Sequence, residues 1–112
     1  MFAGHKGVSN VCLVIDDNKM QLDGDSSSIM PVANWAEKLR AFGWCAVEAD
    51  GHDFASLRSA FETPPSESPL AVVAHTTKGR GVSFMEGAPE WHHGRMTEEQ
   101  YKAALAEIGG GR

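Results

Sequence analysis

The sequence has few cysteines, few basic residues and no long apolar run, and each shortage excludes a class of protein. Its 112 residues include only Cys12 and Cys45, far apart and outside any Cys-x-x-Cys spacing. This usage predicts buried free thiols in a reducing compartment. The formal net charge is −5, and the ten Lys and Arg residues are scattered. These features argue against nucleic acid or an anionic membrane as a partner.

Two further absences concern targeting. No apolar stretch approaches the length of a membrane-spanning helix. Residues 1–7 also lack the long apolar core of a secretory signal. We therefore expect a cytoplasmic protein with no membrane partner.

Three apolar runs predict the strands of a parallel sheet. They lie at residues 11–16, 44–49 and 70–74. The first run is continuous, which is typical of a strand buried on both faces. Helical patterns separate the runs, so parallel pairing through right-handed crossovers is expected. The predicted fold class is α/β, a partial parallel sheet with flanking helices whose open edges need a partner.

Three helices are predicted between and after these strands. The first has Pro31 in its first turn and ends at Gly43, which suits a left-handed cap. Asp53 is the expected N-cap of the second helix. A capping box that starts at Thr97 opens the third helix, which is expected to run through Ile108.

The other segments are predicted loops and a tail. Residues 23–28 are expected to form a polar, flexible loop, and residues 63–66 break the second helix. A glycine-rich segment, residues 75–81, follows the third strand. Residues 109–112 are a predicted flexible tail, which leaves residues 1–108 as one partial domain.

The strand at residues 11–16 leads directly into a polar turn. Asn18 and Met20 are expected outside the carboxyl end of that strand, where α/β sheets bind ligands. A hard oxygen donor at the end of an apolar strand suggests a cation with an attached phosphate. Asn18 is also a common turn residue, so a purely structural role stays open at this point.

The segment Asp-Asp-Asn-Lys-Met-Gln-Leu-Asp-Gly at residues 16–24 resembles the second half of the thiamine diphosphate signature of transketolases. The likeness continues, in matching order and spacing, through residues 35–44, 50–53, 74–86 and 91–93. The resemblance implies an incomplete thiamine-diphosphate-binding fold. The matched part is the C-terminal half of the N-terminal diphosphate-binding domain.

The resemblance also implies roles for particular residues. Asn18 would bind Mg²⁺ through its side-chain oxygen, and Met20 would bind it through its backbone oxygen. Leu22 would pack near the rings of thiamine diphosphate. His92 would be the catalytic and cofactor-contacting histidine, a hydrogen-bond donor to phosphate groups. The implied enzyme transfers a two-carbon ketol unit between sugar phosphates, in the pentose phosphate pathway of carbohydrate metabolism.

Parts of the family's pattern are not in this sequence. Only seventeen residues precede Asn18, and none forms the Gly-Asp-Gly motif whose aspartate completes the cation site. The pyrimidine-binding domain, with the glutamate that activates the cofactor, is not present either. We therefore expect the isolated chain to be inactive. It would act as a homo-oligomer or with a transketolase subunit that carries those segments.

Other interpretations stay open. The chain could be a non-catalytic interaction module, a truncated remnant that oligomerises, or a generic phosphate-binding α/β domain. Residues 78–81 could cradle a phosphate, or close over an active site as a flexible loop. A transition-metal pair at His92 and His93 is disfavoured, because neighbouring side chains point apart. His52 and Asp53 fit a loop contact and a helix cap better than an acid–base pair.

Overall fold

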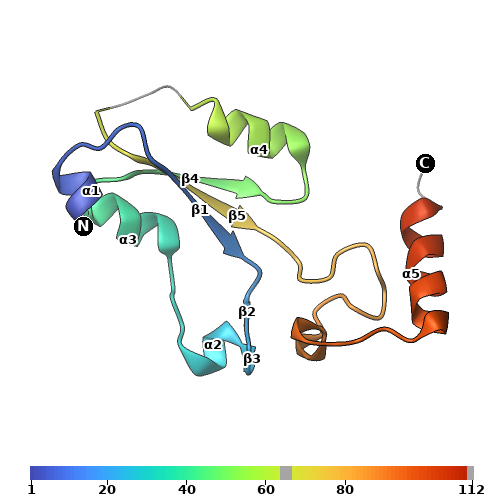
Figure 1. Cartoon of the computed structure of the whole chain (residues 1–112). Helices are drawn as coiled ribbons and strands as arrows, with labels where there is room; N and C mark the ends of the chain where they lie inside the picture. Colours follow the sequence, from blue (N-terminus) through green and yellow to red (C-terminus); the bar gives the residue numbers. More distant parts are fainter. Residues whose placement is uncertain (64–66, 111–112) are drawn as a thin grey trace. The chain divides into compact units, whose positions relative to one another are not determined.

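The computed structural model describes residues 1–63 and 67–110, which divide into two compact units. Unit 1 comprises residues 1–17 and 32–76, and unit 2 comprises residues 18–31 and the chain from Thr77 onward (Figure 1). The chain therefore leaves unit 1 at the end of its first strand and returns to it at Val32.

Unit 1 is built on a three-stranded parallel sheet in the order β1-β5-β4. Its strands are β1 (Cys12–Asp17), β4 (Cys45–Asp50) and β5 (Leu70–His75). In the register, His75 of the central strand pairs with Asp17 on one side and with Asp50 on the other. The three strands therefore end level with one another, at one edge of the sheet.

The central strand β5 carries the core of unit 1. Helices α3 (Trp35–Ala41) and α4 (Phe54–Phe61) pack on β4 and β5. One buried cluster joins Ala36 of α3 to Val73, and the other joins Ala60 of α4 to Val72. Because successive side chains of a strand point to opposite faces, the two helices cover opposite faces of the sheet (Figure 1).

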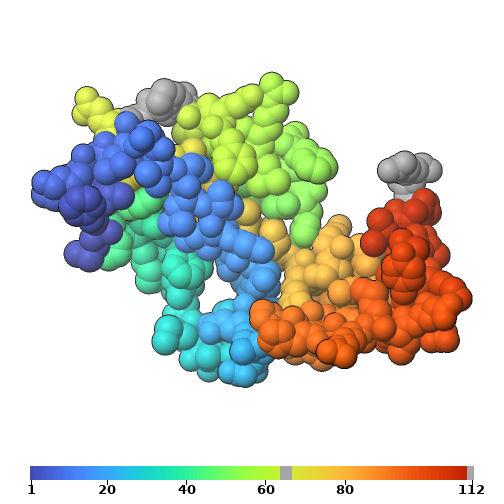
Figure 2. All heavy atoms as spheres, in the orientation of Figure 1, coloured from blue at the N-terminus to red at the C-terminus, as the bar shows by residue number. Residues whose placement is uncertain are grey.

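Strand β1 is not buried on both faces, so that prediction is wrong. Val14 in the middle of the strand is 50% exposed, and the Cys12 thiol is exposed where burial was predicted, while Cys45 is partly buried. The reason is that β1 is an edge strand, whereas α3 and α4 lie over β4 and β5. Figure 2 shows its atoms, in blue, at the surface of the unit. Its apolar run indicates a need for cover that the described residues do not supply.

Helix α3 begins later than predicted. Its N-cap is Asn34, whose side-chain oxygen accepts a hydrogen bond from the Glu37 backbone N–H at 2.9 Å. This side-chain cap, rather than Pro31, fixes the first turn. The predicted end is confirmed, because Gly43 follows the C-cap Phe42 with a φ of +82°, the left-handed region that glycine tolerates best.

The other predicted helix starts are confirmed. Asp53 accepts hydrogen bonds from the backbone N–H groups of Ala55 and Ser56 at the start of α4. In unit 2, α5 (Glu98–Gly109) opens with the predicted capping box between Thr97 and Gln100. Of residues 63–66, which were expected to break the second helix, 64–66 lie outside the described residues, as do residues 111–112 of the expected tail.

Several short elements were not predicted. Helix α1 (Phe2–His5) opens the chain, and the 3-10 helix η1 (Pro89–His92) lies in unit 2. The expected polar loop at residues 23–28 is instead part of a hairpin, β2 (Met20–Gln21) and β3 (Gly24–Asp25), that leads into α2 (Ser26–Ile29). No helix in the part of the chain that the structure describes has the length and apolar character to cross a membrane.

Candidate functional site

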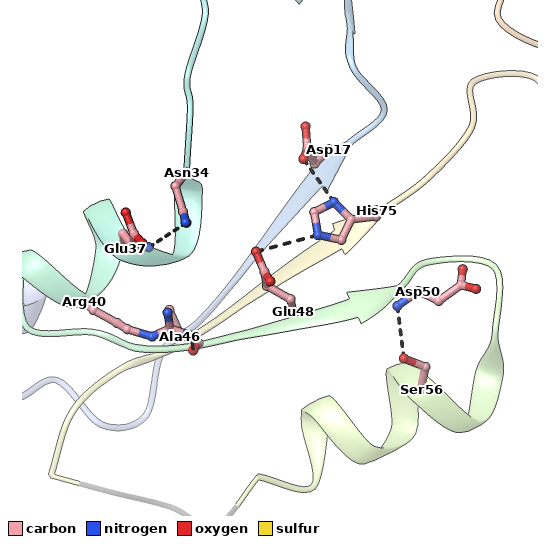
Figure 3. A network of polar contacts seen from close by, with 9 residues as sticks. All are labelled: Asp17, Asn34, Glu37, Arg40, Ala46, Glu48, Asp50, Ser56 and His75. Carbon is pink, nitrogen blue, oxygen red and sulfur yellow. Dashed lines mark hydrogen bonds and ion pairs between the residues drawn. The ribbon is translucent and has the colours of Figure 1, made fainter.

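Polar side chains gather where the strands of unit 1 end (Figure 3). The Nδ1 atom of His75, on β5, lies 3.1 Å from Asp17 Oδ2 on β1. Its Nε2 atom lies 3.7 Å from Glu48 Oε1 on β4. Because a carboxylate can only accept, the Nδ1 atom carries the proton in the contact with Asp17. The imidazole of the central strand therefore reaches carboxylates on both outer strands.

Thr76, the next residue after β5, makes two more contacts with the end of β1. Its hydroxyl donates to Asp16 Oδ1. Its backbone N–H donates to the Asp17 carbonyl oxygen at 3.3 Å. With the His75 contact, three interactions hold the last two residues of β1 against the end of β5.

The turn after β4 is packed against the same strand end. The Gly51 backbone N–H donates to the His75 carbonyl oxygen at 2.8 Å. A Cβ atom at position 51 would collide with the Thr76 methyl group and lie 3.0 Å from the His75 oxygen. The Asp50 backbone N–H donates to Ser56 Oγ at 3.0 Å, which joins the strand to α4 (Figure 3). Close backbone approach therefore requires glycine at position 51.

Asn18 follows β1 directly and opens a tight turn. Its Oδ1 atom accepts a hydrogen bond from the Met20 backbone N–H at 2.9 Å. Lys19, between them, has a φ of +63° and is the only non-glycine residue in the left-handed region among residues 1–63 and 67–110. An Asx turn of this kind brings the side-chain oxygen of one residue next to the backbone of the second residue after it.

The hairpin that follows orients the Met20 carbonyl. Met20 pairs with Asp25 across the antiparallel ladder, and the Ser26 backbone N–H donates to the Lys19 carbonyl oxygen at 2.9 Å. This bond makes Met20 and Asp25 a pair without mutual hydrogen bonds, so the N–H and C=O of Met20 both point away from β3. The N–H meets Asn18 Oδ1 on that side. The Met20 carbonyl oxygen and the Asn18 amide oxygen therefore lie on the same side of the hairpin.

These two oxygens suit a hard cation. An amide oxygen has two lone pairs, so Asn18 Oδ1 can accept from Met20 and still bind a metal ion. Both atoms are neutral oxygen donors of the kind that Mg²⁺ takes beside carboxylate and phosphate oxygens. In the described part of the chain, no group of three or more His, Cys, Asp or Glu side chains is arranged to hold a metal ion. That finding does not bear on amide and carbonyl oxygens.

The rest of the hairpin is polar except at its tip. Hydrogen bonds from the Ser27 hydroxyl and the Ser27 backbone N–H hold the pKa of Asp25 below its ordinary value of 3.8. Asp25 is therefore ionised at neutral pH, as suits an N-cap, and its Oδ1 lies 2.7 Å from the Ser27 nitrogen. Leu22, two residues beyond Met20, is 55% exposed. An exposed leucine at this place is free to cover an apolar ring.

His92 ends η1, and its ring lies edge-on to that of His93, with 4.6 Å between the ring centroids, so the prediction that these two side chains point apart is wrong. Trp91 anchors this turn, because its Nε1 donates to the Phe84 carbonyl oxygen at 2.9 Å. Over the two described stretches, no hydrogen bond joins His92 to Asn18 or Met20. The structure therefore brings Asn18 and Met20 together by direct contact.

The glycine-rich segment after β5 forms successive hydrogen-bonded turns. The Gly87 backbone N–H donates to the Lys78 carbonyl oxygen at 2.9 Å, and the Gly81 N–H donates to Glu86 Oε1 at 3.0 Å. Glu107 of α5 accepts from the Ser83 nitrogen at 2.5 Å and from the Ser83 hydroxyl at 2.8 Å. The Gly81 N–H already donates to the Glu86 carboxylate, which argues against a role for this N–H in binding a phosphate.

Four residues of the strand ends received no role from sequence patterns: Asp16, Asp17, His75 and Thr76. A usable signal was nevertheless present. Two predicted parallel strands end at residues 16 and 74, so the polar residues at those ends must meet at the same edge of the sheet.

A parallel α/β sheet whose edge strand leads into a turn with two oxygen donors on one side has the architecture of α/β domains that bind ligands beyond their strand ends. Comparison with known families identifies the particular family within this class. The family described as "Transketolase, thiamine diphosphate binding domain" matches residues 1–110. The chain belongs to this family, and its α/β fold and its resemblance to transketolases are confirmed.

Individual relatives agree with this family. The chain is 39% identical, over 110 residues, to 6-deoxy-6-sulfo-D-fructose transketolase subunit SqwG of Clostridium sp. (strain MSTE9), a match that covers 96% of the chain and 40% of the relative. It is 35% identical to an apulose-4-phosphate transketolase subunit of Phocaeicola vulgatus, with 90% and 37% covered. The crystal structure of transketolase from Campylobacter jejuni superposes with a TM-score of 0.87 at 28% identity, with 96% and 17% covered.

The lengths of these proteins differ widely. The chain spans about two fifths of each of these two curated relatives and about one sixth of the solved transketolase. The similarity therefore extends over only a part of those proteins.

Proposed function

We propose that this chain supplies one side of a thiamine diphosphate and Mg²⁺ site in a transketolase that moves a two-carbon ketol unit between sugar phosphates. The observation that carries the proposal is the turn at Asn18, which sets an amide oxygen and the Met20 carbonyl on one side of a hairpin. This turn lies directly after a strand in a chain whose family binds thiamine diphosphate.

Each residue of the hairpin has a separate task in this proposal. Asn18 Oδ1 and the Met20 carbonyl bind the cation that neutralises the diphosphate. Leu22 covers the cofactor rings, and His92 donates a hydrogen bond to a phosphate group of the cofactor or substrate. Thiamine diphosphate, when bound, supplies the nucleophilic carbon and the electron sink for carbon–carbon cleavage. The chain itself anchors and orients the phosphate-bearing ligands.

Two neutral oxygens cannot hold Mg²⁺ tightly, because they leave its charge uncompensated. A carboxylate from the Gly-Asp-Gly motif of another segment or subunit completes the site. Two relatives are named as transketolase subunits, which supports pairing with a subunit that carries the pyrimidine-binding domain. The exposed apolar strand β1 supports the same conclusion, since an edge strand of this kind needs a neighbour. The isolated chain is then inactive, and the assembly works in the cytoplasm.

The test is cofactor retention by the chain together with its purified partner. Asn18→Ala should weaken Mg²⁺-dependent retention of thiamine diphosphate by about tenfold or more, since even outer-sphere changes at metal sites have such effects. Asn34→Ala is the matched control, because Asn34 makes a similar hydrogen bond to backbone at the start of α3. Dialysis followed by fluorimetric thiochrome assay measures the retained cofactor. Equal retention by the Asn18→Ala and Asn34→Ala variants would remove Asn18 from the site.

A second function, a non-catalytic interaction module, is favoured by one observation. Strand β1 exposes Val14 and Leu13 along an edge that pairs with nothing among the residues described. This function predicts a stoichiometric complex with the partner that binds no thiamine diphosphate at any Mg²⁺ concentration. Calorimetric titration of the complex with the cofactor distinguishes it from the first proposal.

A further inference from the structure

The end of β1 is held by three contacts from His75, the last residue of β5, and from Thr76, the residue after it. His75 Nδ1 lies 3.1 Å from Asp17 Oδ2, the Thr76 hydroxyl donates to Asp16, and the Thr76 N–H donates to the Asp17 carbonyl oxygen. The Asp17 side chain is only 12% exposed, although it belongs to an edge strand. We name these three contacts of His75 and Thr76 with Asp16 and Asp17 the strand-end clamp.

The strand-end clamp holds the end of an edge strand, β1, directly before the Asn18 turn. On its outer edge β1 has no strand neighbour in the described residues, so β5 alone pairs with it. The turn that starts at Asn18 contains Lys19 in the left-handed region. A strained conformation of this kind persists only where the surrounding structure fixes it. Asp17 is covalently joined to Asn18, so fixing Asp17 fixes one end of the turn.

We propose that His75 and Thr76 are positioning residues for the Asn18 turn. Through Asp17 and Asp16, they fix the end of β1 from which the Asn18 and Met20 oxygens are presented. Neither residue needs to touch the cofactor. The inference rests on the proposed function for its effect on Mg²⁺, but its effect on the turn itself stands independently.

Two measurements on the complete protein with its partner test this inference. The first is hydrogen–deuterium exchange of the Met20 and Ser26 amides, whose N–H groups close the turn. The second is the Mg²⁺ concentration that gives half-maximal retention of thiamine diphosphate. Thr76→Val and His75→Leu should each raise the exchange rates of these two amides and the half-maximal Mg²⁺ concentration. The expected increase is roughly two- to tenfold, the range for one lost hydrogen bond.

Matched variants separate positioning from general damage. His75→Asn keeps an N–H donor close to the place of Nδ1, so it should restore both quantities toward wild type. Ser56→Ala removes a comparable bond at the end of β4 and should leave both unchanged. If His75→Leu fails to fold, the pair Thr76→Val and Thr76→Ser carries the test, because valine preserves the volume and serine preserves the hydroxyl.

The outcomes are distinguishable. Unchanged exchange at Met20 and Ser26 in both Thr76→Val and His75→Leu overturns the inference. The inference is also overturned if the clamp variants exchange faster but keep the wild-type half-maximal Mg²⁺ concentration, while Asn18→Ala changes that concentration. If Asn18→Ala leaves cofactor retention intact, the proposed function fails. In that case faster exchange in the clamp variants still shows that the clamp holds the turn.

Discussion

At the scale of single residues, two positions beside the strand ends adopt backbone arrangements that few side chains allow. Lys19 has a φ of +63°, and Gly51 lies against the Thr76 methyl and the His75 carbonyl. Lys19 is the second residue after β1, and Gly51 is the first residue after β4. The local backbone is therefore most constrained where the strands deliver their polar side chains.

Substitutions of Lys19 test whether the positive φ at this position limits the stability of the turn. Lys19→Gly should leave the turn as stable as in wild type or slightly more so, because glycine adopts positive φ without a steric penalty. Lys19→Val should destabilise the turn by about 1–2 kcal/mol. Exchange of the Ser26 amide, which donates to the Lys19 carbonyl, reports the change. Equal exchange in the two variants would show that the left-handed turn is not maintained in solution.

Gly51 offers a test by paired substitutions. Gly51→Ala should cost about 1–3 kcal/mol of stability, since the added methyl overpacks the site against Thr76 Cγ2. Thr76→Ser removes that methyl and keeps the hydroxyl, so the double variant should recover part of the loss. Urea denaturation of the four proteins gives the coupling energy. Additive losses would mean that the strand end relaxes away from position 51.

The candidate site was only partly predictable from the sequence. Asn18 and Met20 follow an obvious strand, and their proximity is encoded locally by the Asx turn, so their contact could be expected. The meeting of His75 with Asp17 depends on residues 58 positions apart in the chain and on the strand register. The predicted strand ends place both residues at the carboxyl end of the sheet, but their contact depends on the register, which no local pattern encodes.

At the scale of elements, side-chain caps decide where the helices begin. Asn34, Asp53 and Thr97 each accept a bond from the first turn of a helix. The sequence patterns predicted the caps Asp53 and Thr97. For the first helix they predicted a start at Pro31 instead of Asn34, because proline also suits a first turn. The hairpin at Met20 and the short helix at Ser26 were missed, since two-residue strands and single helical turns have no periodicity to detect.

The stability of α5 is predicted to depend on pH through Glu99 in its first turn. The backbone N–H of Glu99 and, to a smaller extent, the Thr97 hydroxyl hold the pKa of Glu99 below its ordinary value of 4.5. A lowered pKa in the folded state means that the ionised Glu99 stabilises α5 above pH 4.5. This contribution is lost as the pH falls through the folded-state pKa.

The measurement is an NMR titration of the Glu99 carboxyl carbon. Its midpoint should lie below 4.5 in the wild type. Thr97→Ala should raise the midpoint only part of the way, because the Glu99 backbone N–H still donates. The same variant should destabilise α5 by about 1 kcal/mol through loss of the cap. An unchanged midpoint in Thr97→Ala would exclude the hydroxyl as a cause.

At the scale of the whole molecule, apolar side chains remain exposed on elements of both units. In unit 1 they include Val14 on β1 and Phe54 on α4, and in unit 2 they include Tyr101 and Ile108 on α5. Single exposed apolar residues are ordinary, but an uncovered edge strand is not.

Strand β1 is therefore the predicted contact with the partner or with a second copy. Val14→Lys should prevent assembly, because a lysine in the middle of an apolar strand cannot be buried without a counter-charge. The variant should still fold, since Val14 is 50% exposed in the chain alone. Ser59→Lys, which adds the same charge to an exposed position of α4, is the matched control and should assemble normally. Size-exclusion chromatography with light scattering, supported by circular dichroism, measures both effects. If the Val14→Lys protein assembles like the Ser59→Lys protein, β1 is not the covered edge, and the assembly must be formed by another surface.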